Sequence, residues 1–120
     1  MNLLIENISD LNDLIMQGDA QKAFEKFYHQ DVVIQWNDEN PVKGKEANRK
    51  LKETDLKNIL EFKSAKPLKV TIGEQSTMVE WQLNDRHKVY GERCFTQVAV
   101  QDWSHGLVIR EKLYCGNKQT

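Results

Sequence analysis

"KVYGERCFTQVAVQDWSHGLVIREKLYCG", residues 88–116, is the stretch that decides the fold class. It contains two long runs rich in β-branched and aromatic residues, separated by the short polar segment 102–106. Such runs are typical of β-strands joined by a turn. A similar run, TMVEWQL at residues 77–83, precedes it, and we predict a tight turn at NDRH, residues 84–87. The C-terminal half therefore predicts a series of antiparallel strands.

The N-terminal half has helical periodicity instead. Apolar residues recur every three or four positions up to Gly18, which predicts a first helix that ends there. Further helices are expected at residues 20–29 and from 45 to about 60, with a short strand at 31–36 between them. The residues expected to be buried are Leu4, Ile8, Leu11, Leu14 and Ile15 on the first helix, and Leu51, Leu56, Ile59 and Leu60 on the third.

Residues 61–72 read as an extended segment, with Pro67 at a break or at a sheet edge. Helices followed by a run of antiparallel strands are the pattern of an α+β fold. We therefore expect one α+β domain covering residues 1–120.

Composition narrows the classes of function. The 17 basic and 18 acidic residues leave a net charge of -1, so electrostatic binding of nucleic acid is not expected. No apolar run approaches the ~18 residues of a membrane span, so no membrane partner is expected. The first residues lack the basic region of a signal peptide, so we expect a cytoplasmic location, with Cys94 and Cys115 as free thiols.

The two turns also predict which residues share a face of the sheet. Centring the first turn on Asp85 and Arg86, and the second between Trp103 and Ser104, places Thr96 opposite Glu111. The more apolar face then points inward and includes Glu111. Its other expected members are Val79, Trp81, Leu83, Tyr90, Glu92, Cys94, Thr96, Val98, Val100, Leu107, Ile109, Leu113 and Cys115.

Three segments carry a resemblance to a known family: GDAQKAFEKFYHQDVVIQW at residues 18–36, PVKGKEANRKL at 41–51 and HGLVIREKLYCG at 105–116. In their order and spacing they resemble the NTF2-like superfamily, particularly its SnoaL-like branch. The resemblance implies a cone in which three N-terminal helices pack on a strongly curved antiparallel sheet. It also implies a pocket on the concave side of that sheet, and homodimers formed through the convex side.

The resemblance does not carry over the catalytic groups of the family's enzymes. Trp36 occupies the position of the base in ketosteroid-isomerase-like members, and Leu11 and Thr96 lie at or near the positions of the oxyanion-hole groups. Leu113 occupies the position of an acid in epoxide-hydrolase-like members. We therefore expect the scaffold without the known catalytic sets, and function has to be argued from this chain's own residues.

Glu111 is the sharpest candidate for a functional residue, because a carboxylate there would be desolvated among apolar neighbours. It could orient a ligand as a polar anchor, or be a structural acid held by Thr96, by a tyrosine hydroxyl or by a basic residue. It could also be an acid/base catalyst, with Tyr28 or Tyr90 donating to an oxyanion. A dyad with Glu92 is not expected, because four strand residues span about 13 Å, beyond the roughly 9.5 Å of the widest carboxylate pairs.

The leading interpretation is a protein that binds a small, mostly apolar organic molecule in the pocket. The alternatives are a lyase, isomerase or cyclase that uses Glu111, and a non-enzymatic dimeric interaction module with a filled cone. The histidines fall outside the predicted inner rows and no Gly-rich phosphate loop is present, so neither a metal site nor a cofactor is expected. The expected pocket residues are Tyr28, Trp36, Trp81, Tyr90, Cys94, Thr96, Glu111 and Leu113, and the expected apolar residues of the dimer face are Phe95, Val108 and Tyr114.

Overall fold

The computed structural model describes residues 3–116 and confirms an α+β architecture, with three helices and a six-stranded sheet in that range. The helices are α1 (Leu3–Met16), α2 (Ala20–Phe27) and α3 (Lys45–Lys57). The strands are β1 (Tyr28–Trp36), β2 (Val42–Lys43), β3 (Ile59–Ile72), β4 (Ser76–His87), β5 (Gly91–Ser104) and β6 (Leu107–Tyr114). Within the described range, none of the helices has the length and apolar character needed to cross a bilayer.

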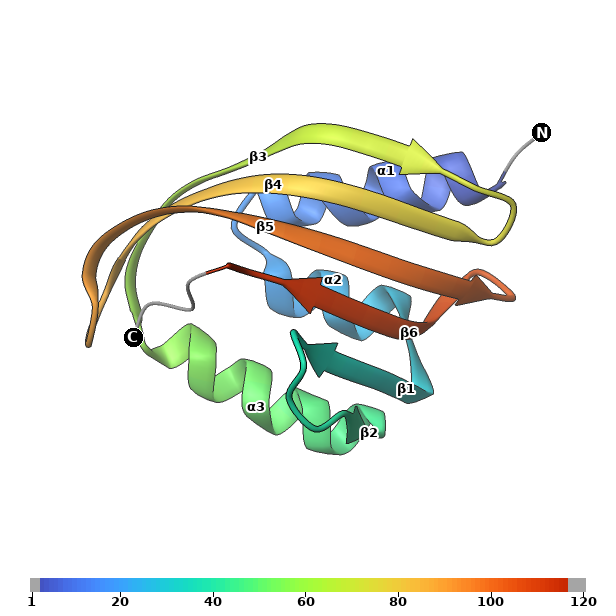
Figure 1. Cartoon of the computed structure of the whole chain (residues 1–120), viewed down its shortest axis with the longest axis horizontal. Coiled ribbons are helices and arrows are strands. Elements are labelled where there is room, and N and C mark those ends of the chain that lie inside the picture. Colours follow the sequence, from blue (N-terminus) through green and yellow to red (C-terminus); the bar gives the residue numbers. More distant parts are fainter. Residues whose placement is uncertain (1–2, 117–120) are drawn as a thin grey trace.

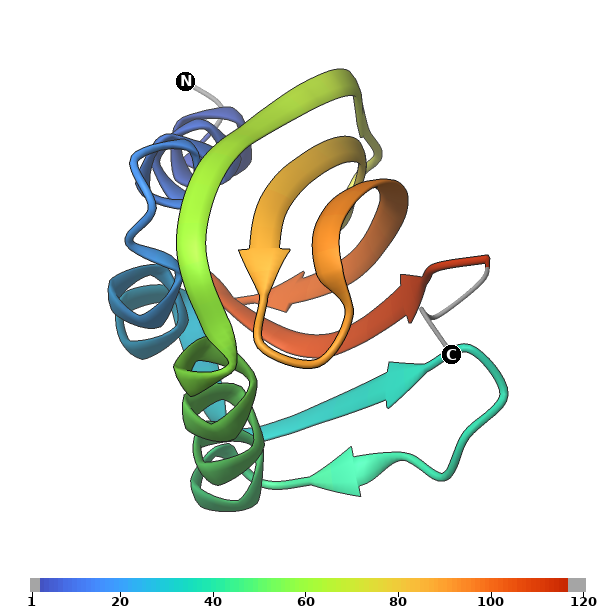
Figure 2. The same ribbon diagram turned by 90° about the vertical axis from the view of Figure 1, so that its left-hand side faces the viewer.

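The sheet has the strand order β2-β1-β6-β5-β4-β3, and its long strands β3, β4 and β5 curl strongly (Figure 1). The three helices lie in a row along one side of this curved sheet (Figure 2). β1 runs parallel to β6, so the prediction of a wholly antiparallel sheet is wrong at that one pairing. β3 is an edge strand, as Pro67 indicated, because proline cannot donate a hydrogen bond to a second neighbour.

The core lies where α1 and α2 meet the sheet. Ile8 and Leu11 of α1 are almost completely buried, as are Phe24 and Phe27 of α2. The Phe27 ring meets Trp103 of β5 edge to face, with 6.2 Å between ring centroids. The buried stripe predicted for the first helix is confirmed, since its remaining members Leu4, Leu14 and Ile15 pack against this core.

The buried stripe predicted for the third helix is wrong at Leu51 and Leu60, whereas Leu56 and Ile59 are half-buried. Leu51 is 51% exposed, and α3 ends at Lys57, so Leu60 belongs to β3, where it is 53% exposed. The buried residue of α3 is Asn48, whose Nδ2 donates to the carbonyl oxygens of Val42 and Gly44 at 3.0 and 2.8 Å. Polar contacts rather than an apolar stripe therefore fix the N-terminal end of this helix.

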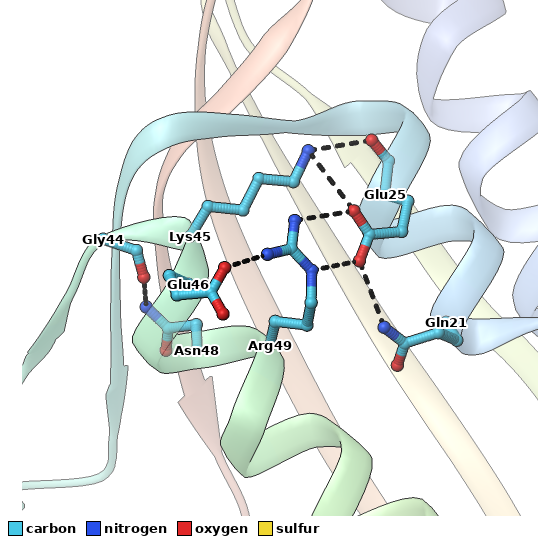
Figure 3. Close-up of polar contacts among 7 residues, drawn as sticks. All are labelled: Gln21, Glu25, Gly44, Lys45, Glu46, Asn48 and Arg49. Carbon is cyan, nitrogen blue, oxygen red and sulfur yellow. Dashed lines mark hydrogen bonds and ion pairs between the residues drawn. The ribbon is translucent and has the colours of Figure 1, made fainter.

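Charged side chains also tie α3 to α2 (Figure 3). Arg49 donates from Nε and Nη2 to the two carboxylate oxygens of Glu25 at 2.6 and 2.9 Å, and it also pairs with Glu46. Lys45 donates to the backbone carbonyl of Glu25 at 2.8 Å. The Arg49 hydrogen bond holds the pKa of Glu25 below its ordinary value.

The predicted hairpin between β4 and β5 is shifted. His87 pairs with Gly91, so the turn consists of residues 88–90, and residues 84–87 belong to β4. Gly91 has a φ of 71°, a conformation that glycine adopts without strain, and this allows the chain to turn later than predicted. The shift exchanges the two faces of β5 relative to the prediction.

As a result, the concave face of β5 carries Arg93, Phe95, Gln97, Ala99 and Gln101, each opposite an inward-facing residue of β4. Cys94, Thr96, Val98 and Val100 lie on the convex face instead of the predicted inner face. Phe95, predicted on the convex face, is one of the residues that point inward.

The hairpin between β5 and β6 has a two-residue turn at His105 and Gly106, both with positive φ. This turn lies two residues later than predicted, and a bulge interrupts the pairing between Asp102 and Trp103; together they place Gln101 and not Thr96 opposite Glu111. The bulge also changes which of the first residues of β6 face inward. Leu107 is only half-buried and Ile109 is 37% exposed, although both were predicted inside, and Val108, predicted outside, is completely buried.

Candidate functional site

A pocket of about 660 Å³ lies on the concave side of the sheet. Tyr28, Gln101 and Glu111 line it, and each is no more than 6% exposed. Phe62 and Tyr90 also line it but are 42% and 45% exposed, so they mark its rim. The pocket therefore has a closed polar floor and a rim that contains aromatic residues.

Cross-strand pairing aligns the floor residues with one another. Glu111 of β6 lies opposite Gln101 of β5, which lies opposite Thr77 of β4. Tyr28 is the first residue of β1, directly after α2, and its ring packs on Phe24 of that helix with 5.0 Å between centroids. The junction between α2 and β1 thus holds the Tyr28 phenol beside the row formed by Glu111, Gln101 and Thr77.

Tyr28 donates its hydroxyl proton to Glu111 Oε2 at 2.5 Å, and Gln101 Nε2 donates to the same oxygen at 2.9 Å. Behind Gln101, Trp103 Nε1 donates to Thr77 Oγ1 at 2.9 Å, and Thr77 donates in turn to Gln101 Oε1 at 2.7 Å. An indole N–H can only donate, so it fixes the direction of this chain of hydrogen bonds. These five residues form the floor network, and its donors all point toward Glu111.

The pKa of the Tyr28 phenol is raised well above its ordinary value. Burial is the main cause, because it disfavours the phenolate, and the adjacent Glu111 carboxylate adds to the effect. Tyr28 therefore remains a neutral hydrogen-bond donor at physiological pH.

A second polar cluster lies on the same face, at the other end of β4. Arg93 donates from Nε and Nη2 to the carboxylate of the buried Asp85, at 2.8 and 2.7 Å. The Arg93 guanidinium also lies over the rings of Phe95 and Tyr90, at 4.8 and 5.9 Å from their centroids. These two charges satisfy one another directly, as buried ions must.

His87 adjoins this cluster and lines the pocket, although it was predicted to lie outside the inner rows. Its Nδ1 accepts the backbone N–H groups of Val89 and Tyr90 at 3.0 and 3.2 Å, so the ring proton of the neutral form belongs on Nε2. The ring stacks on Tyr90 with 4.7 Å between centroids. The prediction missed this residue because it assigned 84–87 to a turn.

Six of the eight predicted pocket residues line the pocket, and two do not. The six are Tyr28, Trp36, Trp81, Tyr90, Glu111 and Leu113. Cys94 and Thr96 are exposed on the convex face, so their predicted orientation is wrong. The cause is the late turn between β4 and β5, which exchanges the two faces of β5. The same register error hid Asp85, Arg93, Phe95, Gln97 and Gln101, all of which line the pocket. Glu92 is exposed and forms an ion pair with Lys63, so it does not form a carboxylate pair with Glu111.

No family model matches the sequence, and no curated protein matches it. Solved structures do match the fold. A protein from Mesorhizobium loti, provisionally described as a SnoaL-like polyketide cyclase, has a TM-score of 0.83 at 21% identity, over 95% of this chain and 99% of its own. An NTF2-like protein of unknown function from Burkholderia pseudomallei has a TM-score of 0.80 at 11% identity, over 96% of this chain and 92% of its own.

A third match extends the range of activities among these structures. An epoxide hydrolase of the LEH-like type from M. tuberculosis has a TM-score of 0.75 at 11% identity, over 96% of this chain and 84% of its own. The chain therefore has the NTF2-like fold that these structures share. This confirms at the level of the fold the resemblance predicted from the three sequence segments.

Proposed function

We propose that this protein binds a small, mostly apolar organic molecule in the concave pocket, with Glu111 as its polar anchor. The observation that carries the proposal is a pocket of about 660 Å³ with a buried, hydrogen-bonded carboxylate on its floor. Ligand sites commonly measure about 300–1,000 Å³ and combine apolar walls with a few convergent polar groups. Trp36, Trp81 and Leu113 supply such walls here.

The pocket volume argues against the third alternative, an interaction module whose cone is filled by side chains. Ala99 of β5 is one reason for the space. It lies between Val79 and Leu113 in the row next to Gln101 and Glu111, and its methyl group reaches less far into the cone than a larger residue would. A cone that served only as core would be expected to fill this position with a larger side chain.

The test is a thermal-shift screen of small organic molecules, followed by calorimetric titration of the hits. The affinity of pocket hits should fall by about tenfold or more in Glu111→Gln, since a hydrogen bond to a charged group is lost. Glu92→Gln is the matched control, because Glu92 is exposed on the convex face, and its affinities should equal those of the wild type. Hits whose affinity is the same in all three proteins would contradict the proposal.

A second candidate function is acid/base catalysis by Glu111. The observation that favours it is the 2.5 Å hydrogen bond between Tyr28 and Glu111. Because the Tyr28 proton is already donated to Glu111, Tyr28 is not free to stabilise an oxyanion, and Tyr90 is at the exposed rim. Glu111 would then act alone on a substrate proton. Incubation of the hits with wild type and Glu111→Gln, followed by mass spectrometry, should give Glu111-dependent turnover. Unchanged substrates would refute this candidate while leaving the binding function intact.

We also propose that the chain forms a homodimer through the convex face of the sheet. Two cross-strand pairs, Met78 with Val100 and Val98 with Tyr114, place neighbouring apolar side chains there, and Met78 and Tyr114 are 49% and 43% exposed. Light scattering coupled to gel filtration should give twice the monomer mass, and Met78→Glu should restore the monomer. A monomeric wild type at high protein concentration would contradict this.

A further inference from the structure

The Glu111 carboxylate is engaged on one side only. Both of its hydrogen bonds, from Tyr28 and from Gln101, reach Oε2. Among the described residues none donates a hydrogen bond to Oε1. Oε1 is also absent from the fully buried side-chain atoms that have no partner, so the protein does not enclose it completely. Since Glu111 lines the pocket, Oε1 is the oxygen that a bound molecule can reach.

The charge of Glu111 also has no counter-ion within the described part of the chain. No Lys, Arg or His of residues 3–116 forms an ion pair with it. Of the basic residues that line the pocket, Arg93 is paired with Asp85, and Lys52 directs its Nζ over the Phe24 ring at 5.6 Å from the centroid. The protein therefore leaves the compensation of this buried charge to solvent or to a ligand.

The ionisable side chains of the whole pocket have an acidic excess. Two basic residues, Lys52 and Arg93, stand against three acidic ones, Asp55, Asp85 and Glu111, which gives a net charge of -1 with His87 neutral. Of the two buried acids among them, Asp85 is paired with Arg93, and Glu111 has no basic partner in residues 3–116. The electrostatic field at the floor therefore favours a cation and disfavours an anion.

The walls beside Glu111 suit an organic cation. Leu113 follows two residues after Glu111 on the same face of β6, and Trp36 of β1 lies directly opposite Leu113. Tyr28 contacts the carboxylate itself, and Trp81 lines the same pocket. Aromatic faces attract ammonium groups through their quadrupole, and the effect grows when water is excluded.

We propose that the ligand is an amine that is protonated at neutral pH, whose ammonium group donates to Glu111 Oε1 while its apolar body packs among Trp36, Trp81 and Leu113. This inference rests on the proposed function, because it names the chemical class that the same pocket accepts. Ala99 leaves the space next to Glu111, so the ammonium group and the first carbons of the ligand fill the deepest part of the cone.

The experiment uses three probes with one skeleton: 2-naphthylmethylamine, 2-naphthylmethanol and 2-naphthoate. Each is titrated into ¹⁵N-labelled wild-type protein, Glu111→Gln and the control Glu92→Gln, and the indole N–H resonances of Trp36 and Trp81 report occupation of the pocket. In the wild type the amine should bind about tenfold or more tighter than the alcohol, and the naphthoate most weakly. Glu111→Gln should abolish the preference for the amine, and Glu92→Gln should retain it.

If the alcohol or the naphthoate moves these resonances with equal or higher affinity than the amine, the charge preference is wrong although the pocket binds ligands. The same holds if the preference for the amine persists in Glu111→Gln. If none of the probes moves them, the inference fails, and the thermal-shift screen then decides the proposed function separately. The comparison of the amine with its isosteric alcohol needs only the wild type, so it decides the inference even if Glu111→Gln fails to fold.

Discussion

At the scale of single residues, the Tyr28–Glu111 pair is the most consequential contact. A hydrogen bond from a neutral phenol to a carboxylate is short and strong, and burial removes the competing water. The sequence allowed three kinds of partner for Glu111, namely Thr96, a tyrosine hydroxyl or a basic side chain. The tyrosine is the one present, with Gln101 as a second donor that the pattern did not indicate.

Tyr28→Phe should lower the free energy of unfolding by about 1.5–3 kcal/mol, because it removes one hydrogen bond to a charged group and keeps the ring. Urea unfolding followed by tryptophan fluorescence measures the change. Tyr90→Phe is the matched control, since Tyr90 is 45% exposed at the pocket rim and should change stability little. Equal effects of the two substitutions would mean that the Tyr28 hydroxyl contributes nothing to the floor network.

The raised pKa of Tyr28 predicts a pH dependence with a definite sign. The folded state binds this proton more tightly than the unfolded state, so the contribution to stability is fully present below the unfolded pKa of about 10. It is lost as pH rises from there toward the higher folded pKa. The stability advantage of the wild type over Tyr28→Phe should therefore shrink above pH 10, which urea unfolding at several pH values can measure. Parallel curves for the two proteins would contradict the assignment.

At the scale of secondary structure elements, β5 shows why the site was harder to predict than the fold. Its alternation offers two faces, and the face with Val98 and Val100 is the more apolar, so hydrophobicity favoured it as the inner one. The structure places Gln101 and Arg93 inside instead, because their partners Glu111 and Asp85 lie on the concave face. A strand that supplies polar groups to a pocket violates the usual pattern, and a site of function is where such violations are expected.

Gly91 sets the late turn that produces the register between β4 and β5. Substituting Gly91 therefore tests how that register is fixed. Gly91→Ala should cost about 1–2 kcal/mol of stability, the penalty for a left-handed conformation in a residue with a Cβ. Among residues 3–116, apart from its own chain neighbours, no heavy atom lies within 4 Å of the Cβ that alanine would add, so the cost comes from the backbone alone. Thermal unfolding of Gly91→Ala and of Gly116→Ala, whose φ is not in the left-handed region, should show the loss only in the first. A loss in neither would mean that Gly91 does not set the turn.

The attachment of α3 to α2 makes a prediction for acidic pH. The pKa of Glu25 is lowered mainly by Arg49, so this pair stabilises the fold above the unfolded pKa of Glu25, 4.5, and the stabilisation is lost as pH falls through the lower folded pKa. Arg49→Gln should reduce stability at pH 7 and should show a weaker dependence on pH between 5 and 3. Lys50→Gln, at the neighbouring exposed position, should behave as the wild type in the same denaturant titrations. An unchanged pH dependence in Arg49→Gln would exclude the proposed role of the pair.

At the scale of the whole molecule, helical and strand periodicity predicted the α+β class and the three helices correctly, because most apolar residues serve the core. The NTF2-like fold was expected from the resemblance of three sequence segments, and Pro67 indicated a break or a sheet edge, of which the structure has the edge. The parallel β1–β6 pairing joins segments that are far apart in the sequence, and periodicity does not report which strands pair. The faces of β5, and with them the polar cluster of Asp85 and Arg93, depend on a turn length that periodicity does not report either. The dimer and the cytoplasmic location remain predictions.

The open cone with Glu111 on its floor is the central claim, and a crystal structure of the wild type bound to its tightest ligand from the screen tests it most directly. The ligand should occupy the concave pocket beside Leu113 and Trp81, with a donor group within about 3 Å of Glu111 Oε1. Side chains that fill the cone, or a ligand bound only on the convex face, would contradict it.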